Sequence, residues 1–240
     1  MNLENRYNKL WNQSLQKFRS NEFEFDPLIN SEDDTRYGIT LLARPSKEIK
    51  QNISETLNEI KNVAPNQYYY REPDLHVTIL SLISCFAGFS LNKIDQSDYR
   101  EVVQSAINSV SPFKIRFHGL TASPSCILVQ GFPKYNQLSK LRNELRQKFK
   151  DSDLQHSIDK RYQLQTAHIT VVRFRHLFEN AERFVNKVAG LRDRNFGSCV
   201  IDQVELVGND WYHQQEKVKS IAKFSLSKQS RRLNYEFPGR

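Results

Sequence analysis

Hydrophobic side chains recur at helical spacing in five stretches of the chain, residues 3–18, 49–63, 99–110, 135–149 and 178–188. Within each stretch the apolar positions return every three or four residues, which places them on one face of an α-helix. Pro65 follows the second stretch and is expected to end that helix. The pattern therefore predicts five helices that each turn one apolar face toward a core.

Shorter apolar runs, of the kind found in β-strands, lie between these helices. They occupy residues 37–42, 75–83, 113–118, 125–131, 165–173, 199–207 and 218–226, with a turn expected at 121–124. In each half of the chain the elements follow the order strand, helix, strand, helix, strand. The repeated order suggests an internal duplication that gives two related lobes, packed as one unit with a cleft between them.

One short pattern, His-x-Thr inside an apolar run, occupies the same place in both halves. The two copies read Leu75-His76-Val77-Thr78-Ile79-Leu80 and Ala167-His168-Ile169-Thr170-Val171-Val172. Residues i and i+2 of a strand point to the same face, so each copy sets an imidazole beside a hydroxyl. The alternate residues, Val77, Ile79, Ile169 and Val171, are expected to face the core.

A single His-x-Thr would be explained well enough by a buried histidine beside a strand threonine. Two copies in matching places instead favour one shared site. Histidine exchanges protons near neutral pH, and threonine is a compact hydrogen-bond donor. Two such pairs facing each other would supply an acid, a base and two donors around one phosphate. The chain shows no metal-ligand pattern such as His-Glu-x-x-His, so neither a metal nor a cofactor is expected.

Charge and cysteine content indicate which kind of partner and which cellular compartment to expect. The formal net charge of +8 favours an anionic partner, although part of the excess lies in residues 228–240. No run approaches the roughly 18 apolar residues of a membrane span. The polar start of the chain lacks the apolar segment of a secretion signal. Cys85, Cys126 and Cys199 are few, far apart and odd in number, which favours reduced thiols and a cytoplasmic protein.

The residues around both motifs resemble those of the two-histidine (2H) phosphoesterase superfamily, which includes the bacterial RNA 2′,3′-cyclic phosphodiesterases once called 2′-5′ RNA ligases. Arg71 stands upstream of the first motif, and the second motif ends in Arg173, as in the longer form of the family pattern. The helix at 138–149 and the segment from 204–207 to Trp211 and Tyr212 are also similar. The resemblance covers roughly residues 36–228.

This resemblance implies an α+β, bilobal fold in which each lobe is a mostly antiparallel sheet with helices outside. The His-x-Thr strands would line the cleft between the sheets. Thr78 and Thr170 would donate to the phosphate oxygens. Our hypothesis makes His76 the general acid at the leaving oxygen and His168 the base that activates water; the sequence leaves the order of these two roles open.

Three further residues are candidates for substrate binding. Arg173 is either a cationic contact for the substrate or a structural surface arginine. Trp211 and Tyr212 either stack on a base or are aromatic residues at the edge of the core. The other histidines lack a threonine two residues on, and most are expected to be surface or satisfied residues; His213, close to Trp211, is the one that could approach the cleft.

The function expected from the sequence is a metal-independent phosphodiesterase that hydrolyses 2′,3′-cyclic phosphate or 2′-5′-linked RNA or nucleotides. The alternatives are an RNA- or nucleotide-binding module of the same fold without turnover, and a reversible 2′-5′ RNA ligase. The expected partner is an RNA end or a small nucleotide, and the expected state is a monomer. We expect an N-terminal helical extension at 1–30, the two-lobed domain at 31–228 and a basic tail at 229–240.

Overall fold

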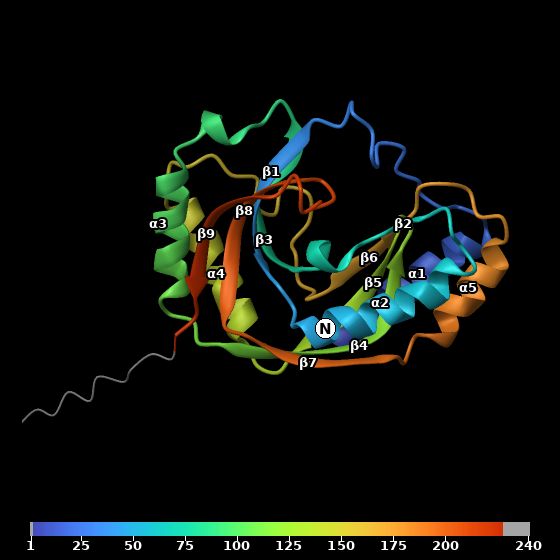
Figure 1. The fold of residues 1–240 in the computed structure, drawn as a ribbon. Helices are drawn as coiled ribbons and strands as arrows, with labels where there is room; N and C mark the ends of the chain where they lie inside the picture. The colour runs from blue at the N-terminus through green and yellow to red at the C-terminus, as the bar shows by residue number, and fades with distance from the viewer. Residues whose placement is uncertain (1, 228–240) are drawn as a thin grey trace, which may run out of the picture.

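Two antiparallel β-sheets form the centre of the protein, and the helices lie outside them (Figure 1). The computed structural model describes residues 2–227, so the basic tail expected at 229–240 lies outside the described residues. The four-stranded sheet has the order β3 (Val77–Ala87), β1 (Arg36–Ala43), β8 (Gln203–Asp210), β9 (Lys219–Ser225). The five-stranded sheet has the order β2 (Tyr68–Tyr69), β6 (Ile169–Arg173), β5 (Cys126–Pro133), β4 (Phe113–Ser123), β7 (Asn195–Ile201).

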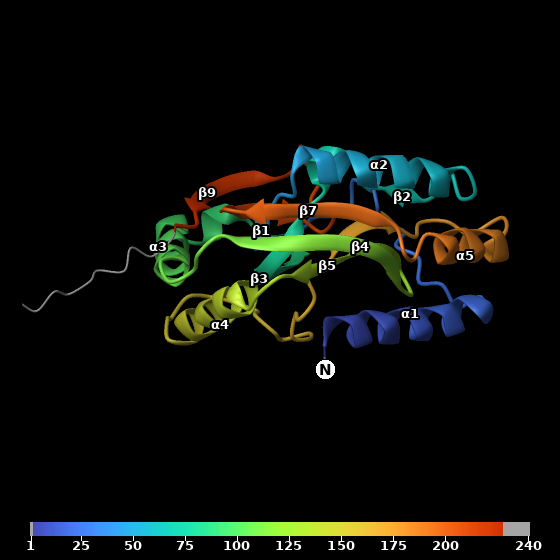
Figure 2. The same cartoon turned by 90° about the horizontal axis from the view of Figure 1, so that it is seen from below.

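The helices cover the outer faces of the sheets, as Figure 2 shows from below. The helices α3 (Gln96–Ile107) and α4 (Gln137–Lys150) pack on each other beside the four-stranded sheet, where α3 contacts β9 and α4 contacts β3. The helices α2 (Lys47–Lys61) and α5 (Ala181–Gly190) belong to the five-stranded sheet, and α2 packs on β7. The α+β architecture with antiparallel sheets and outer helices is confirmed.

The first helix, α1 (Leu3–Arg19), packs on β4 and is part of the core. Asn2 caps its start, because the side-chain oxygen accepts from the amide of Asn5 at 2.8 Å. Its apolar face buries Tyr7, Trp11 and Phe18. Within residues 2–227, no helix is long and apolar enough to span a membrane.

The five helices lie where the hydrophobic spacing predicts them, with ends that differ by a few residues. One expected strand, 199–207, is wrong as a single element. It divides at Asp202 into β7 and β8, which belong to different sheets. The division is invisible in the apolar alternation, because only pairing partners distant in the sequence separate the two strands. The strand β4 also runs through Ser123, so its turn comes later than expected, and β2 was not expected at all.

The order of strands supports the internal duplication. The sheet order β3-β1-β8-β9 corresponds element by element to β6-β5-β4-β7, with the two His-x-Thr strands in equivalent places. The strands that complete each sheet come from the other half, because β4 pairs with β5 of the second half, whereas β8 pairs with β1 of the first half and with β9. Each lobe is therefore built from both halves of the sequence, and neither half contains a complete sheet.

Candidate active site

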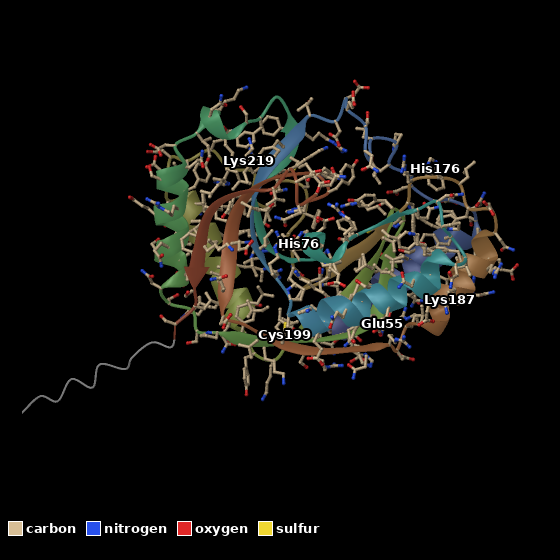
Figure 3. The ribbon with its side chains drawn as sticks, in the orientation of Figure 1. Glu55, His76, His176, Lys187, Cys199 and Lys219 are labelled. Carbon is tan, nitrogen blue, oxygen red and sulfur yellow. The ribbon has the colours of Figure 1, made fainter. Side chains whose placement is uncertain are left out.

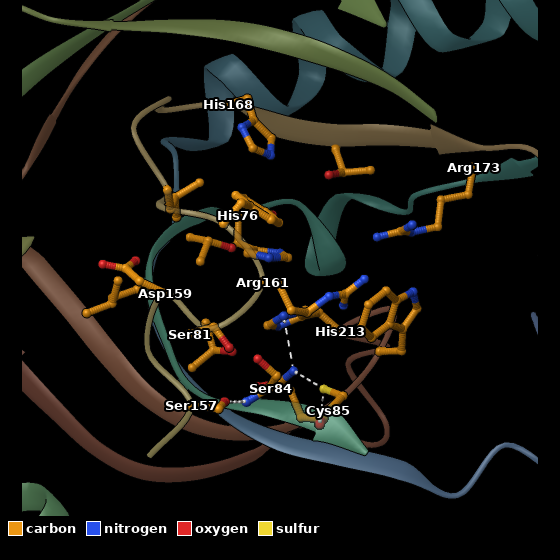
Figure 4. Close-up of a pocket in the computed structure, with 18 of the residues that line it drawn as sticks. His76, Ser81, Ser84, Cys85, Ser157, Asp159, Arg161, His168, Arg173 and His213 are labelled. Carbon is orange, nitrogen blue, oxygen red and sulfur yellow. Dashed lines mark hydrogen bonds between the residues drawn. The ribbon is translucent and has the colours of Figure 1, made fainter. Parts of the chain in front are cut away.

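Both His-x-Thr pairs line one pocket between the two sheets (Figure 4). Each histidine stands immediately before its strand, and the alternation expected from the sequence is present. The inward residues are completely buried, namely Val77, Ile79, Ile169 and Val171. On the other face Thr78 and Thr170 are half-buried, and no hydrogen bond within residues 2–227 uses either hydroxyl. Both hydroxyls are therefore free to donate to a ligand.

His76 is anchored by the short 3-10 helix that precedes it, Glu72–Asp74. Its Nδ1 lies 2.7 Å from the carbonyl oxygen of Asp74. A carbonyl only accepts, so Nδ1 carries a proton and Nε2 is left for the pocket. The fully buried Asp74 carboxylate accepts from Arg71 at 3.0 Å and from the backbone amide of Gln215 at 2.8 Å. The first motif is thereby tied to the loop that joins β8 to β9.

His168 has a different anchor. Its Nδ1 lies 2.7 Å from Oγ1 of Thr166, the threonine two residues before it. A hydroxyl can donate or accept, so this contact permits either tautomer of the ring. Thr166 itself is buried and lies at the end of the segment that leads into β6.

Burial dominates the electrostatics of both rings. It lowers the pKa of His76 to about 4, and the nearby cations Arg44 and Arg173 act in the same direction. Burial also lowers the pKa of His168 to about 4, followed by the charges of Arg142 and Arg173. One contribution separates the two, because the hydrogen bond to the Asp74 carbonyl raises the pKa of His76. For His168 burial and the charges of Arg142 and Arg173 all lower the pKa.

Arg173 ends β6 and places its guanidinium in the same pocket. Its Nε donates to the hydroxyl of Tyr70 at 2.9 Å. In the described part of the chain, Arg173 forms no ion pair with a carboxylate. A guanidinium stays protonated in proteins and offers a planar fork of donors, which suits a phosphate.

Of the two aromatic candidates, only Trp211 lines the pocket. Trp211 lines the pocket, and the guanidinium carbons of Arg36 and Arg161 lie 4.9 and 5.0 Å from its ring centroid. The structure does not bring Tyr212 to the pocket. Tyr212 is buried, and its hydroxyl accepts from Arg36 at 2.8 Å, so it supports the arginine that lies on Trp211.

A third histidine, His213, also lines the pocket, as its closeness to Trp211 in the sequence suggested. Its ring centroid lies 4.0 Å from that of His76. Its Nε2 lies 3.1 Å from the side-chain nitrogen of Asn209, and its backbone has a left-handed φ of 57°. The neighbouring Cys85 is no nucleophile near neutral pH, because burial raises the pKa of its thiol to about 12.

Sequence reasoning missed the segment that follows α4. The loop after Lys150 crosses the pocket and contributes five residues to its lining, Ser157, Asp159, Arg161, Tyr162 and Leu164. Ser157 fixes the loop to β3, since its amide donates to the carbonyl of Leu82 at 2.8 Å. A polar loop carries no periodic signal, so only its position in the fold reveals it.

The family follows from a sequence match that spans both lobes. The family model of the 2′-5′ RNA ligase superfamily matches residues 48–210, which include both His-x-Thr pairs and Arg173. This chain belongs to the 2′-5′ RNA ligase superfamily. The superfamily is that of the two-histidine phosphoesterases, so the resemblance noted from the motifs is confirmed. A search of the curated proteins finds no match.

Solved structures share the fold of this superfamily member at low identity. The protein TT0787 of Thermus thermophilus has a TM-score of 0.61 at 15% identity, over 81% of this chain and 99% of that one. E. coli LigT complexed with 3′-AMP has a TM-score of 0.55 at 12% identity, over 80% and 99%. ATU0111 of Agrobacterium tumefaciens has a TM-score of 0.51 at 13% identity, over 88% and 97%.

Proposed function

We propose that this protein is a metal-independent phosphodiesterase that hydrolyses 2′,3′-cyclic phosphates or 2′-5′ linkages of RNA or nucleotides by acid–base catalysis. The observation that carries the proposal is the meeting of both His-x-Thr pairs in one pocket. Each imidazole is held through Nδ1, and each threonine hydroxyl beside it is free. This arrangement offers a proton donor, a proton acceptor and two neutral hydrogen-bond donors around one phosphate.

The division of work between the histidines follows from their hydrogen bonds. Opening a phosphodiester requires that water lose a proton on one side and the leaving oxygen gain one on the other. Arginine charges oppose a proton on both rings, but the hydrogen bond to the Asp74 carbonyl favours the charged form of His76 alone. We therefore assign His76 as general acid and His168 as general base, each contributing about 10²- to 10⁴-fold.

The phosphate would lie between the two threonines, with Arg173 at one side. Thr78 and Thr170 donate to the non-bridging oxygens, where negative charge builds up as the bond breaks. The Arg173 guanidinium adds a fixed positive charge. Trp211 lines the same pocket, where it would bound the space for a ribose or a base. Support for a nucleotide comes from the E. coli LigT structure, which is complexed with 3′-AMP.

The decisive experiment is a turnover assay with a nucleoside 2′,3′-cyclic phosphate and with a 2′-5′ dinucleotide, each with and without EDTA. We expect hydrolysis of at least one of them, unaffected by EDTA. His76→Gln and His168→Gln should each lower kcat at least about 100-fold. His176→Gln is the matched control, since His176 is exposed at the edge of the molecule whereas His76 lies near its centre (Figure 3).

Two other results of these assays would contradict the proposal. Tight nucleotide binding with no conversion of either compound would favour a binding module over an enzyme. Retention of wild-type turnover by either motif variant would refute the acid–base assignment.

Because the pKa of both rings is lowered to about 4, the bell-shaped pH dependence of kcat/KM should have its optimum below pH 6.5.

A further inference from the structure

One buried arginine joins the strand of the first motif to the segment just before the second motif. Arg142 lies on α4 and is only 3% exposed. Its Nε donates to the carbonyl of Ile79 at 2.7 Å, and its Nη2 donates to the carbonyls of Thr78 and Thr166 at 3.0 and 2.8 Å. The first two carbonyls belong to the strand of the first motif, and the third lies two residues before His168. A single planar group thus bonds to the strand of the first motif and to the segment that leads into the second.

Burying a charged arginine to bond three neutral carbonyls costs free energy. Burial, above all, lowers the pKa of Arg142 to about 10, which reflects the cost of keeping the charge out of water. Among residues 2–227 no carboxylate forms an ion pair with it. A rigid guanidinium fork can reach carbonyls of two separate segments at once, whereas a lysine ammonium is a point donor on a flexible stem.

The segment before His168 is also held by the first helix, α1. The Tyr7 hydroxyl accepts from the amide of Ala167 at 3.2 Å and bonds to Gly131 of the neighbouring strand. The backbone at Thr166 and Ala167 therefore has two fixed attachments, one to α1 and one to α4. These attachments set where His168 starts its strand.

We propose that Arg142 is a positioning residue that fixes the two His-x-Thr strands relative to each other, so that His76 and His168 face opposite sides of one phosphate. This inference rests on the proposed function and deepens it. Displacement of a catalytic group by about 1 Å can cost about 100-fold in rate, so such a joint between the lobes matters directly for turnover.

Arg142 also acts on His168 by its charge. The groups that bear on the His168 ring are the Thr166 hydroxyl, the cations Arg142 and Arg173, and the His76 ring across the pocket. Arg142 is not among the charges that act on His76, which are Arg44, His168 and Arg173. Removing the Arg142 charge should therefore raise the pKa of His168 and should not raise that of His76.

The test compares Arg142→Lys and Arg142→Gln with the control Lys140→Gln. Lys140 is exposed on the same helix and donates to one backbone carbonyl, Ser109, which belongs to neither motif. We expect Arg142→Lys to lower kcat about 10- to 100-fold with less than about a 3-fold change in KM. In Arg142→Gln the pKa of His168, followed by ring-proton NMR, should rise as well. The control should change none of these values.

Amide hydrogen exchange tests, without any substrate, whether the Arg142 hydrogen bonds hold the two segments in place. In Arg142→Lys, exchange should quicken at Thr78, Ile79 and Ala167 together, while Lys140→Gln leaves it unchanged. Wild-type kcat in a folded Arg142→Lys, or unchanged exchange at these amides, would overturn the proposal. Failure of both Arg142 variants to fold would also overturn it, since the arginine would then hold the fold and not the site. If the wild-type protein turned over no substrate, the proposed function would fail. Hydrogen exchange would still test whether Arg142 fixes the two segments.

Discussion

The hydroxyl of Tyr7 provides the sharpest test of how the first helix is joined to the site. The side chain is fully buried, and its hydroxyl makes three hydrogen bonds to backbone groups. It donates to the carbonyl of Gly131 at 3.1 Å and accepts from the amides of Gly131 and Ala167, both at 3.2 Å. One donor and two acceptor sites are all that a hydroxyl offers, so Tyr7→Phe removes every one of them.

The size of the effect follows from these three bonds. Each is worth about 1 kcal/mol net, and a buried amide left without a partner costs more than a bond exchanged for water. Tyr7→Phe should therefore lower the free energy of unfolding by about 3 kcal/mol. For a chain of this size that corresponds to a fall in Tm of about 6 to 12 °C. Because Ala167 directly precedes His168, kcat should fall too.

Urea and thermal unfolding measure the loss, and Tyr135→Phe is the matched control. Tyr135 is 60% exposed, so the same chemical change there should stay within about 0.5 kcal/mol. A loss below about 1 kcal/mol for Tyr7→Phe would refute the reasoning, because the three bonds would then contribute no more than surface contacts. Such a result would also remove the support that α1 is proposed to give to the second motif.

Three further outcomes follow from the geometry. Burial lowers the pKa of His76 to about 4, so the unfolded chain binds a proton at higher pH than the folded one. The free energy of unfolding should fall as pH drops from about 6.5 to 4, and less steeply in His76→Gln; urea titrations at several pH values would show equal slopes if this is wrong. Gly131→Ala should destabilise by about 3 kcal/mol or more, since its Cβ would lie 1.8 Å from the Ala167 carbonyl oxygen, whereas Gly190→Ala meets nothing within 4 Å and should unfold no earlier than wild type. Arg173→Gln should weaken binding of a nucleotide phosphate about 10-fold or more by calorimetry, and unchanged affinity would exclude a phosphate contact.

The sequence alone determined the parts of this protein that depend on local periodicity. The apolar spacing of α1 to α5 is a property of each helix by itself, and the structure keeps all five. The two-residue alternation likewise set which side of each motif faces the core, because a strand turns successive side chains to opposite faces. The motif pairs also sufficed to identify the superfamily.

Only the tertiary structure decided which distant residues meet. Three features depend on contacts with distant parts of the chain. They are the division of 199–207 between two sheets, the pairing of β4 and β8 with strands of the other half, and the loop across the pocket. The same holds for Arg142, which looks like any helical arginine in the sequence but bonds to backbone carbonyls 24 and 63 residues away. Hydrogen bonds of this kind arise when packed layers bring carbonyls together, and no local pattern of polar and apolar residues records them.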